Sequence, residues 1–246
     1  MTIGGSKGGQ SWRWSDHWRG HVFLFEGAPA PTYSASAGLR LLLIVLLLEG
    51  VLGPRLWIAS LLSIPIPPVW IRVPLLLGCA LLAVRFVAGV WLSRIGFRPW
   101  RVWTRTETSY LVQVVLIANV VFCLLFADRL RALFAESSAW SSASVALLTS
   151  FLWGFHQELM YRGILQTELV RRWGSVPGIL VANLLYTFGP LHFYHVSVGS
   201  RALPMFAGIF AIGLLFAVVF RRSGNLWIVA VMHGIGNLYI IGTLPP

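Results

Sequence analysis

Seven long runs of apolar residues divide this chain and limit what it can fold into. They lie at about 38–53, 69–92, 109–127, 143–170, 177–196, 203–220 and 225–243. A helix needs about 20 apolar residues to cross a bilayer, because each residue adds about 1.5 Å. Backbone groups in lipid must be satisfied within the segment, and these runs lack the alternation of barrel strands. The sequence therefore predicts an all-α, polytopic transmembrane helix bundle of about seven spans.

The composition agrees with lipid as the solvent. Hydrophobic residues make up 57% of the chain and charged residues only 11%, whereas a soluble domain has about 25% charged residues. A net charge of +11 would indicate nucleic-acid binding in a soluble protein. Here the arginines lie between apolar runs, as in the loops of membrane proteins. We therefore expect membrane lipid as a partner and no nucleic acid.

The distribution of basic residues predicts the topology. With the N-terminus inside, the inner segments hold twelve basic residues: Lys7, Arg13, Arg19, Arg40, Arg94, Arg98, Arg101, Arg105, Arg171, Arg172, Arg221 and Arg222. The outer segments hold five: Arg55, Arg72, Arg129, Arg131 and Arg201. Cytoplasmic loops collect positive charge, so the N-terminus is expected inside and the C-terminus outside.

Residues 1–37 differ from the rest of the chain. They place Trp12, Trp14 and Trp18 among basic residues, and tryptophan prefers the headgroup layer. This segment is therefore either an interfacial tail or a disordered one. With no repeat and no second domain evident, residues 38–246 are expected to form a single transmembrane domain.

Polar residues within the fourth span are the first sign of a site. This run contains His156, Gln157, Glu158 and Arg162. A charged group at the centre of a membrane helix costs about 2.5–3.5 kcal/mol, so each one needs a partner or a role. Glu158 and Arg162 are four residues apart on one helix face and can form an ion pair.

Two further runs add polar groups. The fifth run contains His192, and the seventh contains His233 with Asn237 one turn later. Membrane helices bury such groups by turning them toward each other or toward a water-filled cavity. Each group alone fits a structural role, as an ion pair, an interfacial histidine or interhelical hydrogen bonding. Their occurrence on three spans favours one site with a general base and oxyanion donors.

Other polar residues in or near the spans are given no chemical role. Glu49 and Arg85 are lone charges in the first two spans, with structural or snorkelling roles. Gln166 and Glu168 are expected to be solvated at the inner end of the fourth span, and His195 to be interfacial.

These motifs resemble the CPBP family (CAAX protease and bacteriocin-processing, Abi-like) of glutamic-type intramembrane proteases. That family carries Glu-Glu-x-x-x-Arg, Phe-x-x-x-His and His-x-x-x-Asn on successive helices. The chain matches their order and spacing with the segments 157–162, 188–192 and 233–237, and Tyr161-Arg162-Gly163 resembles the end of the first motif. The resemblance covers about 143–243, which it implies to be the catalytic core.

One position departs from the family pattern. The first glutamate, which the resemblance would assign as the water-activating base, is Gln157 here, and an amide cannot accept a proton as a carboxylate does. Three accounts remain open. Glu158 serves as the base while Gln157 orients water, the chain is a non-catalytic relative, or the sequence is a Glu-to-Gln variant.

The resemblance implies an intramembrane endopeptidase of a bacterial or archaeal cell membrane, acting on a peptide or membrane-anchored protein. Glu158 and His192 would activate water, His233 and Asn237 would donate to the oxyanion, and Arg162 would hold Glu158. The alternatives are a non-catalytic binding or immunity protein and a proton-coupled transporter, although no repeat typical of transporters is evident. No cofactor is expected. A zinc ion bound by Glu158, His192 and His233 is the alternative.

Overall fold

The structure is a computed structural model. It describes residues 31–52, 62, 65, 67–103, 105–125, 127–128, 139–190, 192, 196, 199–200 and 202–241. The predictions for residues 1–30 and for His195 lie outside these residues.

Every regular element in the described parts of the chain is a helix, which confirms the all-α prediction. In chain order the elements are α2 (Ala35–Val45) with the π-helix η2 (Leu46–Leu52), α4 (Val69–Leu82) with the π-helix η3 (Ala83–Val87), the 3₁₀ turns η4 (Leu92–Ile95) and η5 (Trp100–Val102), α5 (Arg105–Leu125), α7 (Ala139–Glu158) continued by the π-helix η6 (Leu159–Gln166) and by α8 (Thr167–Trp173), α9 (Ser175–Phe188), α10 (Ala202–Ser223) and α11 (Leu226–Ile241). Each of the seven predicted runs overlaps one helical segment.

Four of these segments are long and apolar enough to cross a membrane, judged by length and composition of the described residues. They are Ala35–Leu52, Trp70–Val87, Glu107–Leu124 and Ala202–Ser223. Ser175–Phe188 and Leu226–Asn237 are shorter apolar helices. A helical membrane bundle is therefore what the fold shows.

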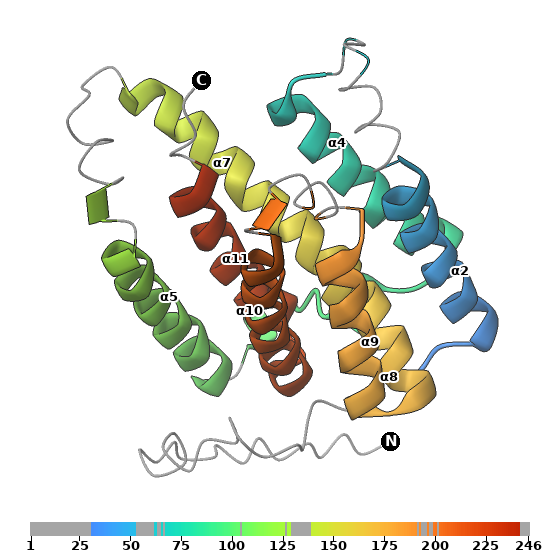
Figure 1. The fold of residues 1–246 in the computed structure, drawn as a ribbon. Helices are drawn as coiled ribbons and strands as arrows, with labels where there is room; N and C mark the ends of the chain where they lie inside the picture. The colour runs from blue at the N-terminus through green and yellow to red at the C-terminus, as the bar shows by residue number, and fades with distance from the viewer. Residues whose placement is uncertain are drawn as a thin grey trace.

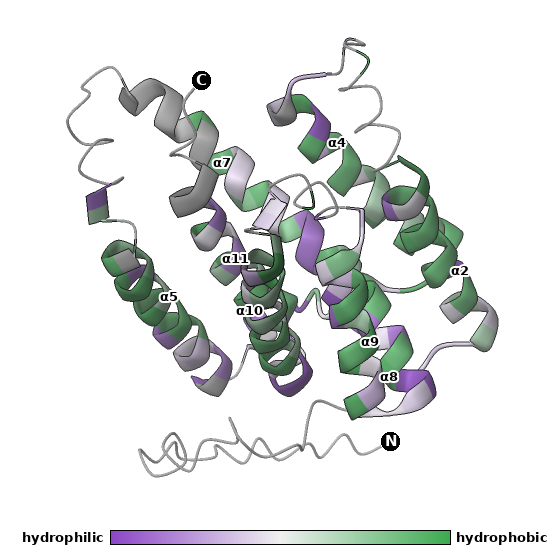
Figure 2. Ribbon diagram, viewed as in Figure 1, coloured by the Kyte–Doolittle hydropathy of each residue, from purple (hydrophilic) through white to green (hydrophobic). Residues whose placement is uncertain are grey.

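The bundle is apolar outside and polar inside. Large hydrophobic side chains such as Leu116, Leu124 and Leu203 are exposed, whereas Glu158, Arg162 and other polar residues are almost fully buried. Figure 2 shows hydrophobic residues along most of α2, α5, α9 and α10 and hydrophilic residues near the lower ends of α8 and α10. This distribution of apolar and polar side chains is the reverse of that in a soluble protein. It is the distribution expected for helices surrounded by lipid.

The continuous helix α7–η6 is the axis of the bundle (Figure 1). α7 packs against α11 and α4, and η6 packs against α2, α9, α10 and α11. A Cβ atom at Gly154 would lie 2.7 Å from the backbone nitrogen of Gly234. The absence of side chains at this crossing therefore lets α7 and α11 approach closely enough to bring their polar groups together.

The fifth predicted span is too long at its C-terminal end. The run was expected to continue to 196, but α9 ends at Phe188 and Gly189 is extended. Pro190 explains the end, because proline lacks an N–H and disfavours helical backbone in the residue before it. His192 therefore lies in a turn after the helix, where its backbone nitrogen donates to the carbonyl oxygen of Gly189 (3.0 Å).

The expectation that Gln166 and Glu168 are solvated is wrong. They are 1% and 0% exposed. The carboxylate of Glu168 accepts hydrogen bonds from Tyr33, Arg171 and Arg172 at 2.6–2.9 Å, so the cost of burying its charge is offset.

Candidate functional site

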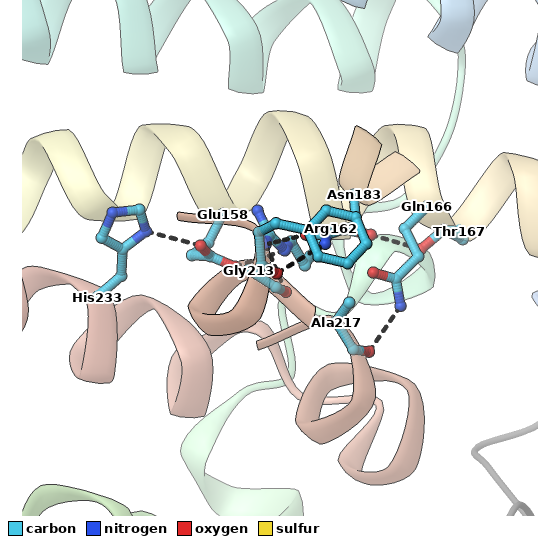
Figure 3. A network of polar contacts seen from close by, with 9 residues as sticks. Glu158, Arg162, Gln166, Thr167, Asn183, Gly213, Ala217 and His233 are labelled. Carbon is cyan, nitrogen blue, oxygen red and sulfur yellow. Dashed lines mark hydrogen bonds and ion pairs between the residues drawn. The ribbon is translucent and has the colours of Figure 1, made fainter. Parts of the chain in front are cut away.

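Glu158 and His233 form the centre of the candidate site. Glu158 is the last residue of α7, is fully buried, and lies against α11. Nδ1 of His233 lies 2.7 Å from Oε1 of Glu158, as Figure 3 shows. An ionised carboxylate only accepts hydrogen bonds, so Nδ1 carries the proton. The pairing fixes the tautomer and orientation of the imidazole.

Arg162 holds the other side of the same carboxylate. Its Nε lies 3.3 Å from Oε2 of Glu158, four residues earlier on the helix. Its Nη2 donates to the carbonyl oxygen of Gly213 at 2.7 Å, and the guanidinium lies 4.1 Å from the ring centre of Tyr186. Planar guanidinium groups combine such stacking with hydrogen bonding. Arg162 thus connects η6 to both α9 and α10.

Two atoms in this ion pair lack hydrogen bonds. Oε2 of Glu158 and Nη1 of Arg162 are buried and have no hydrogen-bond partner among the described residues. Buried polar atoms without partners are rare, and each one calls for an explanation such as an ordered water or a ligand. Oε2 of Glu158 faces the Arg162 guanidinium at 3.3 Å and still has the capacity to accept a hydrogen bond.

His192 is connected to the Glu158–His233 pair by Tyr186, which contacts both histidines. Nδ1 of His192 lies 2.8 Å from the carbonyl oxygen of Tyr186, so Nδ1 donates and a neutral ring keeps its basic lone pair on Nε2. The ring of Tyr186 lies 4.7 Å from the His192 ring and 6.2 Å from the His233 ring, centre to centre. Tyr186 was not identified from the sequence, where an aromatic residue in an apolar run carries no signal.

Gln157 and Asn237 are not bonded to Glu158. Gln157 is 4% exposed and immediately precedes Glu158 on the helix, with a rotation of about 100° between them, so the two side chains leave the axis in different directions. Nδ2 of Asn237 donates to the carbonyl oxygen of Ser150 at 3.4 Å. Ser150 precedes Glu158 by eight residues, or about 12 Å along the helix. The structure therefore gathers Glu158, Arg162 and His233, with His192 nearby and Asn237 one turn away.

Asn183 is a further member of this network that sequence reasoning missed. Its Nδ2 donates to the carbonyl oxygen of Phe210 at 2.9 Å, and its Oδ1 lies 3.5 Å from Nη2 of Arg162. It is 1% exposed on α9. The sequence does contain a signal for Asn183, because a side-chain amide within an apolar run needs a hydrogen-bond partner, just as a charged group does.

A second buried carboxylate–histidine pair lies beside the first. Glu49 of η2 places Oε1 3.0 Å from Nε2 of His156, which precedes Gln157. The side chains of Glu49 and His156 are 6% and 3% exposed. Glu49 is therefore a paired internal group and not a lone charge that snorkels toward the membrane surface. Both Glu49 and Glu158 adjoin π-helical segments, which often occur at functional sites.

A metal-binding arrangement is not present among the described residues, where no three His, Cys, Asp or Glu side chains are grouped as ligands. Glu158, His192 and His233 accordingly do not form the set that the zinc alternative requires. The arrangement offers instead a carboxylate acceptor, two imidazoles and a fixed guanidinium within a low-dielectric interior.

A comparison with family models points to the same part of the chain. Residues 139–239 match the model described as type II CAAX prenyl endopeptidase Rce1-like. The matched segment begins with α7, reaches into α11, and includes every motif residue discussed above. The comparisons with curated proteins and with solved structures gave no match. The segment 139–239, which carries Glu158, Arg162, His192, His233 and Asn237, is therefore similar to the Rce1-like endopeptidases of the CPBP family.

Proposed function

We propose that this protein is an intramembrane endopeptidase in which Glu158 and a histidine activate water. The observation that carries the proposal is the open Oε2 of Glu158, a buried carboxylate oxygen without a hydrogen bond. A water molecule bound there would be polarised by a base in a site of low dielectric. The family match supports a membrane-associated peptide or protein as the proposed substrate.

The reaction begins with water attacking the scissile carbonyl carbon. The water proton passes to Oε2 of Glu158 or to Nε2 of His192, which is the basic nitrogen when Nδ1 donates to Tyr186. The carbonyl oxygen becomes an oxyanion. The accepted proton then passes to the leaving nitrogen as the carbon–nitrogen bond breaks, which yields a carboxylic acid and an amine.

His233 and Asn237 are the proposed oxyanion donors. A protonated His233 is stabilised by the Glu158 carboxylate and has its Nε2–H available for the oxyanion. The amide of Asn237 would exchange its 3.4 Å contact with Ser150 for the oxyanion, which is a small loss because a hydrogen bond of that length is weak. Arg162 keeps the carboxylate in place, and Gln157 orients the water.

The second candidate function is peptide binding without cleavage. It is favoured by Gln157 and by the fact that Glu158 is already paired with Arg162 and His233. Oε1 of the carboxylate then faces the imidazole and Oε2 faces the guanidinium. The helices around Glu158 would then bind a peptide without cleaving it, as in an immunity protein.

Cleavage by purified protein distinguishes the two functions. The substrate is a prenylated peptide ending in a Cys-a-a-X sequence, and release of the residues after the prenylated cysteine is followed by mass spectrometry. The wild type should cleave, and Glu158→Gln should reduce the rate about 10²–10⁴-fold. Asn237→Ala should reduce the cleavage rate about 10²–10³-fold, because one oxyanion donor is lost. Peptide binding without cleavage by the wild type would select the second function.

A further inference from the structure

The proposed reaction makes no use of the buried pair formed by Glu49 and His156. Oε1 of Glu49 in η2 lies 3.0 Å from Nε2 of His156 in α7. An ionised carboxylate only accepts hydrogen bonds, so Nε2 donates, and Nδ1 of a neutral ring keeps the basic lone pair. Oε2 of Glu49 and Nδ1 of His156 are buried and make no hydrogen bond within the described part of the chain. The pair therefore keeps two atoms at which a proton can be accepted.

Glu49 differs from the other buried glutamates in its partners. Glu107, Glu158 and Glu168 each face at least one arginine guanidinium. Among the described residues, Glu49 has an imidazole partner and no arginine. Protonation of a carboxylate that faces a buried guanidinium leaves a buried cation unpaired, which is strongly unfavourable. Glu49 can take up a proton without breaking such an ion pair.

Tyr161 of η6 lies between this pair and the candidate site. It is 2% exposed, and its hydroxyl interacts electrostatically with the Glu49 carboxylate. A Cβ atom at Gly189 would lie 3.1 Å from the Tyr161 hydroxyl oxygen, and the carbonyl oxygen of Gly189 accepts the hydrogen bond of the turn that carries His192. The ring of Tyr161 packs edge-on against Tyr186 at 5.2 Å, centre to centre. A phenol hydroxyl both donates and accepts, so Tyr161 can pass a proton from one side to the other.

We propose that Glu49 and His156 store a proton for the hydrolytic reaction and exchange it with the candidate site through Tyr161. This inference rests on the proposed endopeptidase function. The first acceptor, Glu158 or His192, takes a proton from the attacking water. It then gives a proton to the Tyr161 oxygen while the Tyr161 proton moves to Oε2 of Glu49. The first acceptor is thereby free of the proton, and Glu49 is a neutral carboxylic acid.

The stored proton returns by the reverse path when the carbon–nitrogen bond breaks, and it ends on the leaving nitrogen. The pair is therefore unchanged after each turnover. Gln157 follows His156 directly in the chain, at the position where the family motif has a carboxylate. An amide does not hold a proton as a carboxylate does. A store at Glu49 supplies the proton capacity that position 157 lacks.

The test measures cleavage of the prenylated peptide by full-length protein. Glu49→Gln keeps an oxygen that accepts from His156 but removes the proton store, so kcat should fall on the order of 10²-fold with KM little changed. Tyr161→Phe keeps the ring and should lower kcat in the same way. Gln157→Glu places a carboxylate next to His156. The double variant Glu49→Gln/Gln157→Glu should therefore recover most of the lost rate, which a merely structural role of Glu49 would not allow.

Glu107→Gln is the matched control, because Glu107 of α5 is a buried carboxylate that pairs with Arg98. It should keep the wild-type kcat, and thermal melts establish that each variant folds. The wild-type rate in a folded Glu49→Gln protein, or a loss that Gln157→Glu does not restore, would overturn the inference. Cleavage by the single variant Gln157→Glu but not by the wild type would also overturn it, because the pair would then supply no proton capacity. No cleavage by either protein would refute the proposed function itself, and this inference with it.

Discussion

The carboxylate of Glu49 in η2 lies 3.0 Å from Nε2 of His156 in α7, and this contact joins the first helical segment to the one that carries the family motif. Oε2 of Glu49 and Nδ1 of His156 are buried and make no hydrogen bond within the described part of the chain. The 3.0 Å contact therefore offsets part of the cost of burying the two residues.

Removing one member of this pair should destabilise the protein strongly. A buried ionic partner left alone costs about 3–5 kcal/mol, so Glu49→Ala or His156→Ala should lower Tm by at least about 6–12 °C. The double variant should lose less than the sum of the single variants, with a coupling of about 0.5–3 kcal/mol. Thermal melts of purified protein measure this, with Asp128→Asn at an exposed carboxylate as control. Additive effects would show that the pair does not interact.

Restoring the family carboxylate at position 157 tests whether Glu158 is the base or whether the chain is inactive without the first glutamate. If Glu158 is the working base, Gln157→Glu should gain little activity or lose some, because a second buried carboxylate next to Glu158 disfavours ionisation of both. If the chain is inactive because it lacks the first glutamate, the Gln157→Glu variant should cleave the peptide and the wild type should not. The peptide-cleavage assay gives the answer, with thermal melts to confirm that each variant folds.

The glycine crossing between α7 and α11 should be intolerant of a methyl group. A Cβ atom at position 154 would lie 2.7 Å from Gly234 and 3.0 Å from the backbone of His233. Gly154→Ala should therefore separate the helices, cost about 1–3 kcal/mol and displace His233 from Glu158.

Gly78→Ala in α4 is the matched control, since a Cβ atom there meets nothing within 4 Å. Alanine is better than glycine within a helix by about 0.5–1 kcal/mol, so this variant should melt at the same or a slightly higher temperature. A Gly154→Ala protein that melts and cleaves like the wild type would show that the close approach is not required.

We predict that no metal ion is required. The chain lacks the paired histidines of a zinc helix, and no three potential ligands are grouped among the described residues. Purified protein treated with a chelator should retain its cleavage activity, and elemental analysis should find no stoichiometric zinc. One tightly held zinc per chain, lost in His233→Ala, would contradict the glutamate mechanism.

The N-terminus is predicted to lie inside and the C-terminus outside. Single cysteines are placed at positions 103 and 135 of a protein whose native Cys79 and Cys123 have been replaced, because both native residues are exposed. A membrane-impermeant maleimide added from outside should label position 135 and spare position 103. Labelling of both positions from outside would refute the seven-span arrangement.

The sequence predicted those features that depend on local spacing. Apolar runs predicted the helices because a membrane helix must satisfy its own backbone, and the spacing of Glu158 and Arg162 predicted their contact. The cost of polar groups in lipid predicted that polar side chains of neighbouring spans turn toward each other or toward a cavity, and His233 and Glu158 do face each other.

Features that depend on packing between distant segments were not predictable in this way. The partner of Glu49 lies 107 positions away, and no periodicity connects the two. Glu168 is at a helix end, where solvation is the usual outcome, but Tyr33 and two arginines enclose it. The turn that carries His192 was missed because the run was delimited by its hydropathy alone. The Gly189–Pro190 pair, which is typical of a helix end, was not taken into account.

If a membrane-anchored substrate reaches Glu158 from the bilayer, the hydrogen bond between Arg162 and the carbonyl oxygen of Gly213 disfavours entry between α9 and α10. Separation of α9 from α10 would strain the guanidinium, which contacts Tyr186 on one helix and Gly213 on the other. α5 packs mainly on α11, and no contact of Glu158 or Arg162 involves it. A lateral gate at α5 would therefore open the protein to the bilayer while the charge arrangement around Glu158 stays intact.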